Sequence, residues 1–348
     1  MPDFPKIAID AMGGDFGPQV TVAAAANILK RRKGVKLILV GLEEQIRLQM
    51  SKLHLQDSER LSVIHASEIV AMDESPSQAL RKKKDSSMRV AINLVSDGTA
   101  SAAVSAGNTG ALMATAKFVL KTLPGIDRPA IMTALPNTMG HTHMLDLGAN
   151  VDSSADHLFQ FAVMGSVTAA AVDNVENPRV GLLNVGSEAT KGNAQVKAAE
   201  SLLQHSGLNY IGFVEGDDIF NGSVDVVVCD GFVGNISLKS TEGAAKMISH
   251  FMRESFNRNI FTKLIALLAL PVLKSFKKRV DHRRYNGASL LGLKDIVIKS
   301  HGGADAYAFG KAIEVAILEV EKSIPQRIDS HLDTLLDKTI EKSVQPSE

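Results

Sequence analysis

The sequence predicts an α/β protein whose sheet is mostly parallel and Rossmann-like, with helices on both faces. Short apolar or β-branched runs alternate with longer segments of helical periodicity along most of the chain. The runs lack a clean polar alternation, which is typical of strands that are buried on both faces. The predicted strands are Lys6–Asp10, Lys36–Val40, Leu61–His65, Ala102–Ser105, Pro129–Ala134, Met144–Leu147, Val180–Val185, Asn209–Val214 and Asp225–Cys229.

Helical patterns between these strands supply the crossover connections that parallel pairing requires. We expect one catalytic α/β domain over residues 1–337, long enough to divide into two lobes, followed by a polar tail over 338–348. The predicted helices are Ala23–Arg32, Glu43–Leu53, Ala111–Lys121, Ala155–Val172, Val196–Gln204, Thr241–Arg253 and Ala304–Lys322.

Composition excludes several classes of protein. Of the 348 residues, 38 are basic and 38 are acidic, so no global field favours nucleic acid as a partner. A single cysteine, Cys229, excludes an internal disulfide framework. The longest apolar run, Leu264–Leu273, is well short of the roughly 20 residues that span a bilayer, and a strand pattern begins at Ile7. We therefore expect a cytoplasmic protein that is neither secreted nor transmembrane.

The segment Phe251–Arg284 breaks the α/β alternation. Its pattern predicts helix around the apolar run Leu264–Leu273, which contains Pro271 and is flanked by lysines and arginines. An apolar centre with basic ends suits a helix that lies in a membrane interface, and it also suits an arm buried between two subunits. Composition leaves both interpretations open and, taken alone, favours the dimer arm.

Five glycine-bearing polar corners follow predicted strands. In an open α/β sheet such corners expose backbone N–H groups and helix N-termini at the carboxyl ends of strands. We expect them to line one crevice that binds a small anion, helped by side-chain amides and one or two lysines. The corners are Asp10–Pro18, Ser105–Leu112, Asp146–Asn150, Val180–Asn193 and Asp230–Lys239.

Other catalytic signatures are missing from the sequence. There is no G-x-G-x-x-G, no G-x-x-x-x-G-K-[ST] and no G-x-S-x-G, which argues against a dehydrogenase, an ATPase and a serine hydrolase. Cys229 lies in an apolar strand and is expected to be a buried structural thiol. His141 and His143 have strand spacing, but no third ligand is near them, so we expect surface histidines and no metal.

Several segments together resemble the PlsX-type phosphate acyltransferases of bacterial phospholipid synthesis, along nearly the whole chain. The matches occur in the family's order and include the glycine corners in full or in part. They are IAIDAMGGDFGP at 7–18, SAGNTGAL at 105–112, GIDRPA at 125–130, LDLGANVD at 145–152, GLLNVGSEATKGN at 181–193, DVVVCDGFVGNISLK at 225–239 and YNGASLLGLKDIVIKSHG at 285–302.

The resemblance implies transfer of a fatty acyl group from acyl carrier protein to inorganic phosphate, without a cofactor. The acyl phosphate would serve the next acyltransferase, which acts on glycerol 3-phosphate. The resemblance also implies a homodimer, a fold similar to phosphotransacetylases and to isocitrate and isopropylmalate dehydrogenases, and peripheral attachment to the anionic inner face of the cell membrane. Two alternatives are a short-chain acyl-coenzyme A phosphotransacetylase and a non-catalytic membrane scaffold for acyl carrier protein.

Site residues follow from combining the corners with this resemblance. Lys191 is expected to hold phosphate, and Asn235 to donate to phosphate or to the developing oxyanion, with Asn108 as a further donor. Asp10 and Asp146 are expected chiefly to order loops, because bare carboxylates repel phosphate. The residues expected at the phosphate and substrate site are Asp10, Gly13, Gly14, Ser105, Gly107, Asn108, Thr109, Asn150, Gly186, Ser187, Gly192, Asn193, Asp230, Gly231 and Gly234.

The resemblance also changes the interpretation of Phe251–Arg284. It favours a helical pair that protrudes from the dimer and touches lipid, with the basic residues near anionic headgroups. The residues expected to contact lipid are Ile265, Leu267, Leu268 and Val272.

Overall fold

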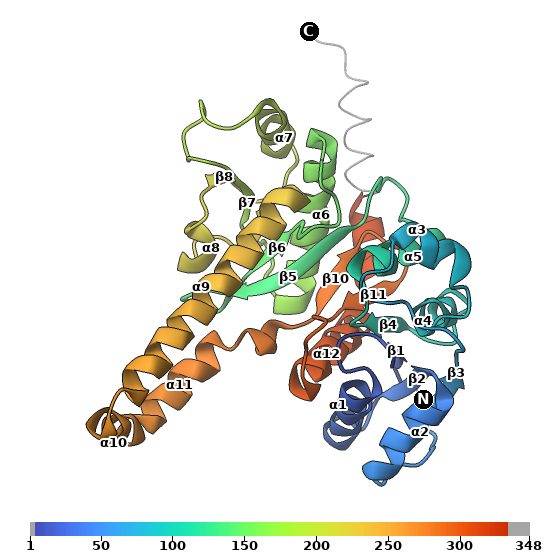
Figure 1. The fold of residues 1–348 in the computed structure, drawn as a ribbon. Coiled ribbons are helices and arrows are strands. Elements are labelled where there is room, and N and C mark those ends of the chain that lie inside the picture. Colours follow the sequence, from blue (N-terminus) through green and yellow to red (C-terminus); the bar gives the residue numbers. More distant parts are fainter. Residues whose placement is uncertain (1–3, 333–348) are drawn as a thin grey trace.

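A computed structural model describes residues 4–332, without the side chains of residues 277, 278, 280 and 282. Within this range the strands form one sheet of eleven strands, in the order β3-β2-β1-β4-β11-β10-β5-β6-β9-β7-β8. Helices cover both faces of the sheet (Figure 1). The expected tail over 338–348 lies outside the described residues.

The first third of the chain builds the lobe that contains β1 to β4. Each strand here is parallel to its neighbours in the lobe, as the alternation of strands and helices predicts. The elements are β1 (Lys6–Asp10), α1 (Pro18–Arg31), β2 (Lys36–Gly41), α2 (Glu43–Lys52), β3 (Leu61–His65), α3 (Pro76–Lys82), α4 (Ser87–Ser96), β4 (Ala102–Ser105) and α5 (Thr109–Leu120).

The rest of the chain builds a second lobe and then returns to the first. Strands β6, β9, β7 and β8 are parallel to one another. The elements are β5 (Ala130–Pro136), β6 (His141–Leu145), α6 (Ala155–Asp173), β7 (Val180–Leu183), α7 (Ala194–Gln204), β8 (Tyr210–Val214), α8 (Asp218–Asn221), β9 (Val226–Val228), α9 (Gly231–Asn257), α10 (Ile260–Leu268), α11 (Leu270–Val280), the 3-10 helix η1 (His282–Tyr285), β10 (Ala288–Leu291), β11 (Ile296–Lys299) and α12 (Ala306–Lys322).

Antiparallel pairing at the centre of the sheet divides it into two oppositely directed sets of strands. Strand β10 is antiparallel to both β11 and β5, and β5 is antiparallel to β6. These three reversals make the strands of the second lobe run opposite to those of the first. The sequence predicted neither β10 nor β11, although each is a short and mostly apolar segment.

Alternate residues of the central strands pack on opposite faces of the sheet. On β1, Ile7 and Ile9 pack with α1 and α12, whereas Ala8 packs with α4 and α5. The cluster that contains Ala8 continues into the second lobe through Leu147 and Val227. Burial on both faces explains why these strands are apolar runs in the sequence rather than alternating patterns.

Helix α9 differs most from the sequence prediction. It begins at Gly231, well before the predicted start at Thr241, because the Asp230 side chain accepts a hydrogen bond from Val233 N at 2.9 Å and caps the helix. The glycines of DGFVGN therefore lie in the first turns of a helix, not in a loop. Helices α3 and α4 were not predicted either, and each has a serine cap.

The helical arm consists of the distal part of α9 with α10 and α11, and it projects away from both lobes (Figure 1). Its helices match the helical prediction for Phe251–Arg284. None of the nine residues of α10 is buried, and Leu268 is 77% exposed. Within residues 4–332, no helix has the length and apolar character that crossing a membrane requires.

Candidate functional site

Asp10 organises the corner at the carboxyl ends of β1 and β4. Its carboxylate accepts hydrogen bonds from Ser105 Oγ at 2.6 Å and from Met12 N at 3.3 Å, and Ser105 Oγ in turn accepts from Gly107 N at 3.0 Å. Burial raises the pKa of the Asp10 carboxyl. A Cβ at Gly13 would lie 2.6 Å from Asp10 Oδ2 and 2.8 Å from Gly107 N, so only glycine lets the loops after β1 and β4 pack this closely.

Asn108 acts as a structural cap in this corner. Its Oδ1 accepts from Ala111 N at 2.9 Å, and its Nδ2 donates to Met72 O at 2.7 Å and to Glu74 O at 3.1 Å. Because both amide hydrogens bind backbone carbonyls, Asn108 is not free to donate to phosphate as the sequence analysis expected. Thr109 is exposed in the first turn of α5.

Asp146 organises a second corner, at the carboxyl end of β6. The carboxylate accepts from Ile131 N, Ala149 N and Asn150 N at 2.7–3.1 Å, and from Asn150 Nδ2 at 3.0 Å. Burial raises its pKa, while these donors oppose the shift. Asn150 also donates to Pro129 O, so both of its amide hydrogens serve the corner.

The start of α9 packs directly on the Asp146 corner. A Cβ at Gly234 would lie 1.9 Å from Asp146 O, and one at Gly231 would lie 2.4 Å from Asn150 O. The next residue, Asn235, is exposed, and its side chain lies beside Gly148. No described residue forms a hydrogen bond with the Asn235 amide, which leaves it free for a ligand.

Lys191 lies in the loop between β7 and α7. Its stem packs over Gly186, which has no Cβ, and its backbone N–H donates to Glu188 O at 2.9 Å. Asn193 caps α7 by accepting from Val196 N, and Gly192 has a φ of +90°. Ser187 and Lys191 are exposed, and the Lys191 ammonium has no partner among residues 4–332.

The five corners fall into two groups, not one row. The corners of Asp10 and Ser105 follow the carboxyl ends of strands in the first lobe. The corners of Asp146, Gly186 and Asp230 follow the carboxyl ends of strands in the second lobe, which run in the opposite direction. In the second group, Leu145 and Leu182 both pair with Val228, so the three loops start side by side. The central strands reverse direction, so the two groups start from oppositely directed strands, and the crevice lined by all five corners stays a prediction.

Lys299, at the end of β11, is a polar residue that is not among the predicted site residues. It pairs with Ser105 across the sheet, and its Nζ donates to Ala106 O at 3.4 Å and to Ser300 O. Burial lowers the pKa of its ammonium to about 8, an effect that the charges of Asp10 and Asp15 oppose and that of Lys239 reinforces. The signal for it was present, since a lysine directly follows an apolar run and precedes two glycines.

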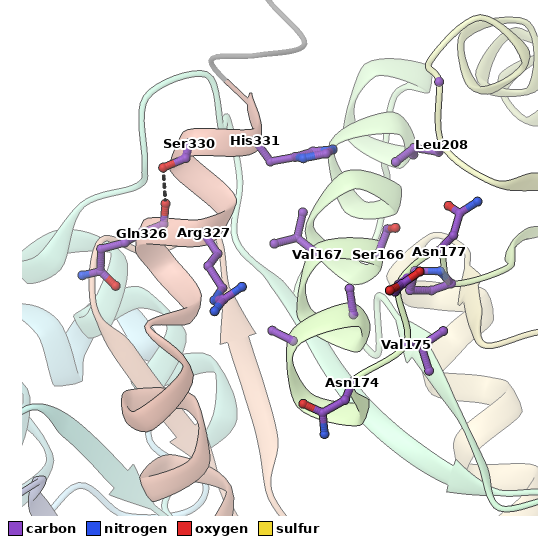
Figure 2. Close-up of a pocket in the computed structure, with 15 residues that line it drawn as sticks. Ser166, Val167, Asn174, Val175, Asn177, Leu208, Gln326, Arg327, Ser330 and His331 are labelled. Carbon is purple, nitrogen blue, oxygen red and sulfur yellow. Dashed lines mark hydrogen bonds between the residues drawn. The ribbon is translucent and has the colours of Figure 1, made fainter.

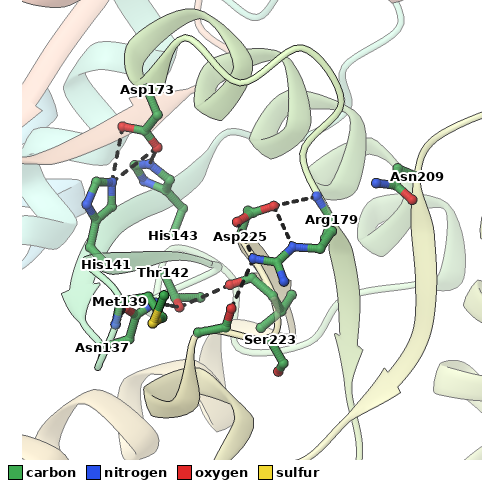
Figure 3. A network of polar contacts seen from close by, with 12 residues as sticks. Asn137, Met139, His141, Thr142, His143, Asp173, Arg179, Asn209, Ser223 and Asp225 are labelled. Atoms are coloured by element: carbon green, nitrogen blue, oxygen red, sulfur yellow. Dashed lines mark hydrogen bonds and ion pairs between the residues drawn. The ribbon is translucent and has the colours of Figure 1, made fainter.

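His141 and His143 share a carboxylate (Figure 3). Asp173, the last residue of α6, lies 3.1 Å from His141 Nε2 and 2.7 Å from His143 Nε2. Against the effect of burial, hydrogen bonds from the two rings hold the pKa of Asp173 far below its usual range, and the same carboxylate raises the pKa of His141. The expectation of surface histidines was wrong, because His143 is 6% exposed and a third group, distant in sequence, meets both rings.

This cluster has the residue types of a cation site, with ligand atoms within 4.8 Å of one another. Asp173 already accepts from both rings, however, so a hydrogen-bonded network accounts for the arrangement. Nearby, Arg179 binds Asp225 through Nε and Nη2 at 2.8–3.0 Å (Figure 3). The contacts of Asp173 with the two histidines and of Arg179 with Asp225 belong to the second lobe and lie outside the polar corners.

A cavity of about 860 Å³ lies between α6 and the helix at 324–332 (Figure 2). Val167, Asn174 and Arg327 are among the residues that line it. None of the predicted site residues does so, and the cavity therefore belongs to a different part of the molecule from the polar corners.

Cys229 is buried, as predicted. Its Sγ lies 3.7 Å from Asp146 O, and burial raises its pKa well above the usual value. Because the thiolate is the nucleophilic form, this position suits a structural thiol.

A family model and two relatives match this chain along nearly its whole length. A family model described as a fatty acid synthesis protein matches residues 5–327. A phosphate acyltransferase of Alkalilimnicola ehrlichii is 64% identical over 323 residues, covering 93% of this chain and 94% of the relative. A phosphate acyltransferase of Nitrosococcus oceani is 61% identical over 325 residues, covering 93% and 96%.

Solved phosphotransacetylases share the fold at low identity. The structure from Streptococcus pyogenes matches with a TM-score of 0.62 at 20% identity, covering 92% of this chain and 95% of that chain. The EutD phosphotransacetylase from Staphylococcus aureus matches with a TM-score of 0.59 at 17% identity, covering 91% and 94%. These likenesses confirm the predicted α/β fold class. The family model and the close relatives lead to one conclusion: the chain belongs to the PlsX-type phosphate acyltransferase family.

Proposed function

We propose that this protein transfers a fatty acyl group from acyl carrier protein to inorganic phosphate. The observation that carries the proposal is the identity of 57–64% with proteins named phosphate acyltransferase, over more than 90% of the chain. A phosphate oxygen attacks the thioester carbonyl carbon, the carbon–sulfur bond breaks, and the thiolate leaves and takes up a proton. Phosphate is itself the nucleophile, so no acyl-enzyme is required.

We place the reaction beside Asn235 and Lys191. Two features support this placement. Both side chains are exposed without a partner among the described residues. Asn235 lies in the first turns of the helix after β9, and Lys191 lies in the loop after the neighbouring strand β7. Asn235 donates to phosphate or to the oxyanion, and Lys191 offsets negative charge. Loss of one such donor typically costs about 10²- to 10³-fold in rate.

The test measures acyl-phosphate formation and thermal unfolding for Asn235→Ala and Lys191→Ala. Lys52→Ala, which removes an exposed lysine from α2, is the matched control and is expected to keep wild-type turnover. Near-normal turnover in both folded site variants would overturn the placement. A burst of covalent acyl-protein on mixing with donor would contradict direct attack by phosphate.

The choice of donor separates the proposal from its alternatives. We expect turnover with long-chain acyl carrier protein and little with acetyl-coenzyme A, which a short-chain phosphotransacetylase would prefer. Binding of acyl carrier protein without phosphate- or arsenate-dependent loss of the thioester would instead support a non-catalytic scaffold.

We also propose peripheral attachment to an anionic membrane through the arm. Ile265, Leu267, Leu268 and Val272 are 57–77% exposed, which supports lipid contact, although a partner subunit could cover the same apolar face. We expect Leu268→Glu to reduce co-sedimentation with anionic liposomes, and Leu48→Glu on α2, a control that is also exposed, to leave it unchanged. Equal binding of all three proteins would argue against lipid insertion.

We infer a homodimer whose product passes to a glycerol-3-phosphate acyltransferase. Phe232 and Ile236, exposed at the start of α9, support a subunit interface near the proposed site. Analytical ultracentrifugation of wild type and Phe232→Glu tests this: a dimer that the substitution weakens is the expected result, and a wild-type monomer would overturn it.

A further inference from the structure

We propose that His141, His143 and Asp173 form a zinc-binding site in the second lobe. The site takes one Zn²⁺ ion, held by Nε2 of each imidazole ring and by a carboxylate oxygen of Asp173. The inference goes beyond the proposed function, because the cluster lies outside the polar corners and takes no part in acyl transfer.

Two separate elements bring the three side chains together. His141 and His143 are two residues apart on β6, so their rings lie on the same face of the sheet. Asp173 ends α6, 32 and 30 residues further along the chain, and its carboxylate lies 3.1 Å from His141 Nε2 and 2.7 Å from His143 Nε2. The rings are packed edge to face, with centroids 4.8 Å apart, and both turn Nε2 toward Asp173 (Figure 3).

The spacing of the ligand atoms is close to that of a zinc site. Zn–N and Zn–O bonds of about 2.0–2.1 Å at tetrahedral angles place two ligand atoms roughly 3.3 Å apart. The contacts of 2.7 and 3.1 Å therefore need only small side-chain movements, and all the candidate ligand atoms lie within 4.8 Å of one another. The hydrogen bonds keep the ligands together without the ion. When zinc binds, the proton of each Nε2 moves to Nδ1 or to solvent, and the nitrogen lone pair binds the metal.

The charge of the cluster favours a dication. In the described part of the chain, the ion pairs of Asp173 are formed with His141 and His143 only. The nearby Arg179 is bound to Asp225 through Nε and Nη2. Because neutral imidazoles do not cancel the charge of a carboxylate, the three ligands together carry a net negative charge that attracts Zn²⁺.

The ligand types and their exposure indicate zinc and leave it a path to the site. Imidazole nitrogens suit zinc, whereas Mg²⁺ and Ca²⁺ prefer oxygen ligands throughout. The side chains of His141 and Asp173 are 32% and 23% exposed, so an ion can enter from solvent and a water molecule can complete the tetrahedron. His143, at 7%, fixes the inner side of the site.

The position of the cluster predicts a structural role for the ion. Zinc would join the end of α6 to the start of β6, and so cross-link segments that are distant along the chain. Asp146 follows the opposite end of β6, where it organises its polar corner. We therefore expect zinc to stabilise the second lobe without being needed for turnover.

His141→Gln separates metal binding from hydrogen bonding. The glutamine amide can still donate to Asp173, but it does not replace imidazole as a zinc ligand. Calorimetry on chelator-treated wild type should show one Zn²⁺ per chain, and Co²⁺ should give the visible absorption of a tetrahedral site. We expect affinity to fall more than about 100-fold in His141→Gln, since loss of an outer-shell partner alone costs about 10- to 100-fold. His205→Gln, at an exposed histidine after α7, is the matched control and should bind zinc as wild type does.

Thermal unfolding provides a second measurement. Zinc at about 100 times its Kd should raise the Tm of wild type and His205→Gln by about 4 °C, and should leave His141→Gln and Asp173→Asn unchanged. Without zinc, His141→Gln should melt within about 2 °C of wild type. No stoichiometric zinc binding by wild type overturns the inference, because the cluster is then a hydrogen-bonded network only. Equal zinc binding by His141→Gln and wild type, or its loss in His205→Gln, also overturns it.

Discussion

The two ends of α9 lie in opposite environments although they belong to one continuous helix. At the N-terminal end, Gly231 and Gly234 are buried so tightly against the Asp146 corner that no side chain fits. In the middle of the helix a Cβ at Gly243 would meet nothing within 4 Å, and toward the distal end Phe251 is 56% exposed. The first turns therefore hold the proposed site against a tightly packed lobe, while the distal turns expose apolar side chains.

The largest expected effect is that of Gly234→Ala. A methyl group would lie 1.9 Å from Asp146 O and 2.9 Å from Cys229 Sγ, so the helix must move away from the corner. We expect the free energy of unfolding to fall by about 3 kcal/mol or more, measured by urea denaturation. A variant within about 1 kcal/mol of wild type would contradict this contrast, because the N-terminal end would then be as free as the arm.

Asp146→Asn ranks second. The substitution exchanges one carboxylate oxygen, which accepts hydrogen bonds, for an NH₂ group, which donates them. Buried backbone N–H groups that bind this oxygen then lose their acceptor. We expect a loss of about 2–3 kcal/mol in urea denaturation. Glu254→Gln, at an exposed carboxylate on the distal half of α9, should change stability by less than about 0.5 kcal/mol. Comparable losses in the two variants would remove the distinction between the ends.

Matched N-caps provide a third test. Asp230 caps α9 through Val233 N at 2.9 Å, and Asn259 caps α10 through Thr262 N at 3.0 Å. Each change to alanine should cost about 1 kcal/mol. We expect Asp230→Ala to lower the global unfolding midpoint, and Asn259→Ala to speed amide hydrogen exchange in α10 without moving that midpoint. A global shift from Asn259→Ala would show that the arm unfolds together with the lobes.

The smallest effect belongs to Gly243→Ala. The added methyl group meets open space, and alanine has a higher helix propensity than glycine by about 0.8–1 kcal/mol. Slower amide exchange in the surrounding turns of α9, with unchanged turnover, is the expected result. Destabilisation would indicate that this face packs against a partner subunit, which would favour the dimer arm over lipid contact.

Local patterns explain how much of the fold could be predicted. Apolar runs such as Lys6–Asp10 and Leu61–His65 became strands with the predicted bounds. Strands β10 and β11 were missed because such short apolar segments beside a predicted helical arm carry little periodicity. The early start of α9 was missed because glycine signals a turn in sequence, whereas here close packing requires it.

Short-range patterns in the chain were enough for the α/β class, the polar corners, the family and the helical nature of the arm. The three-dimensional structure was needed to learn that the central strands reverse, that Asn108 and Asn150 are occupied while Asn235 is free, and that Asp173 meets two histidines. Strand direction and side-chain partners depend on contacts between residues that are distant along the chain, and local periodicity contains no record of those contacts.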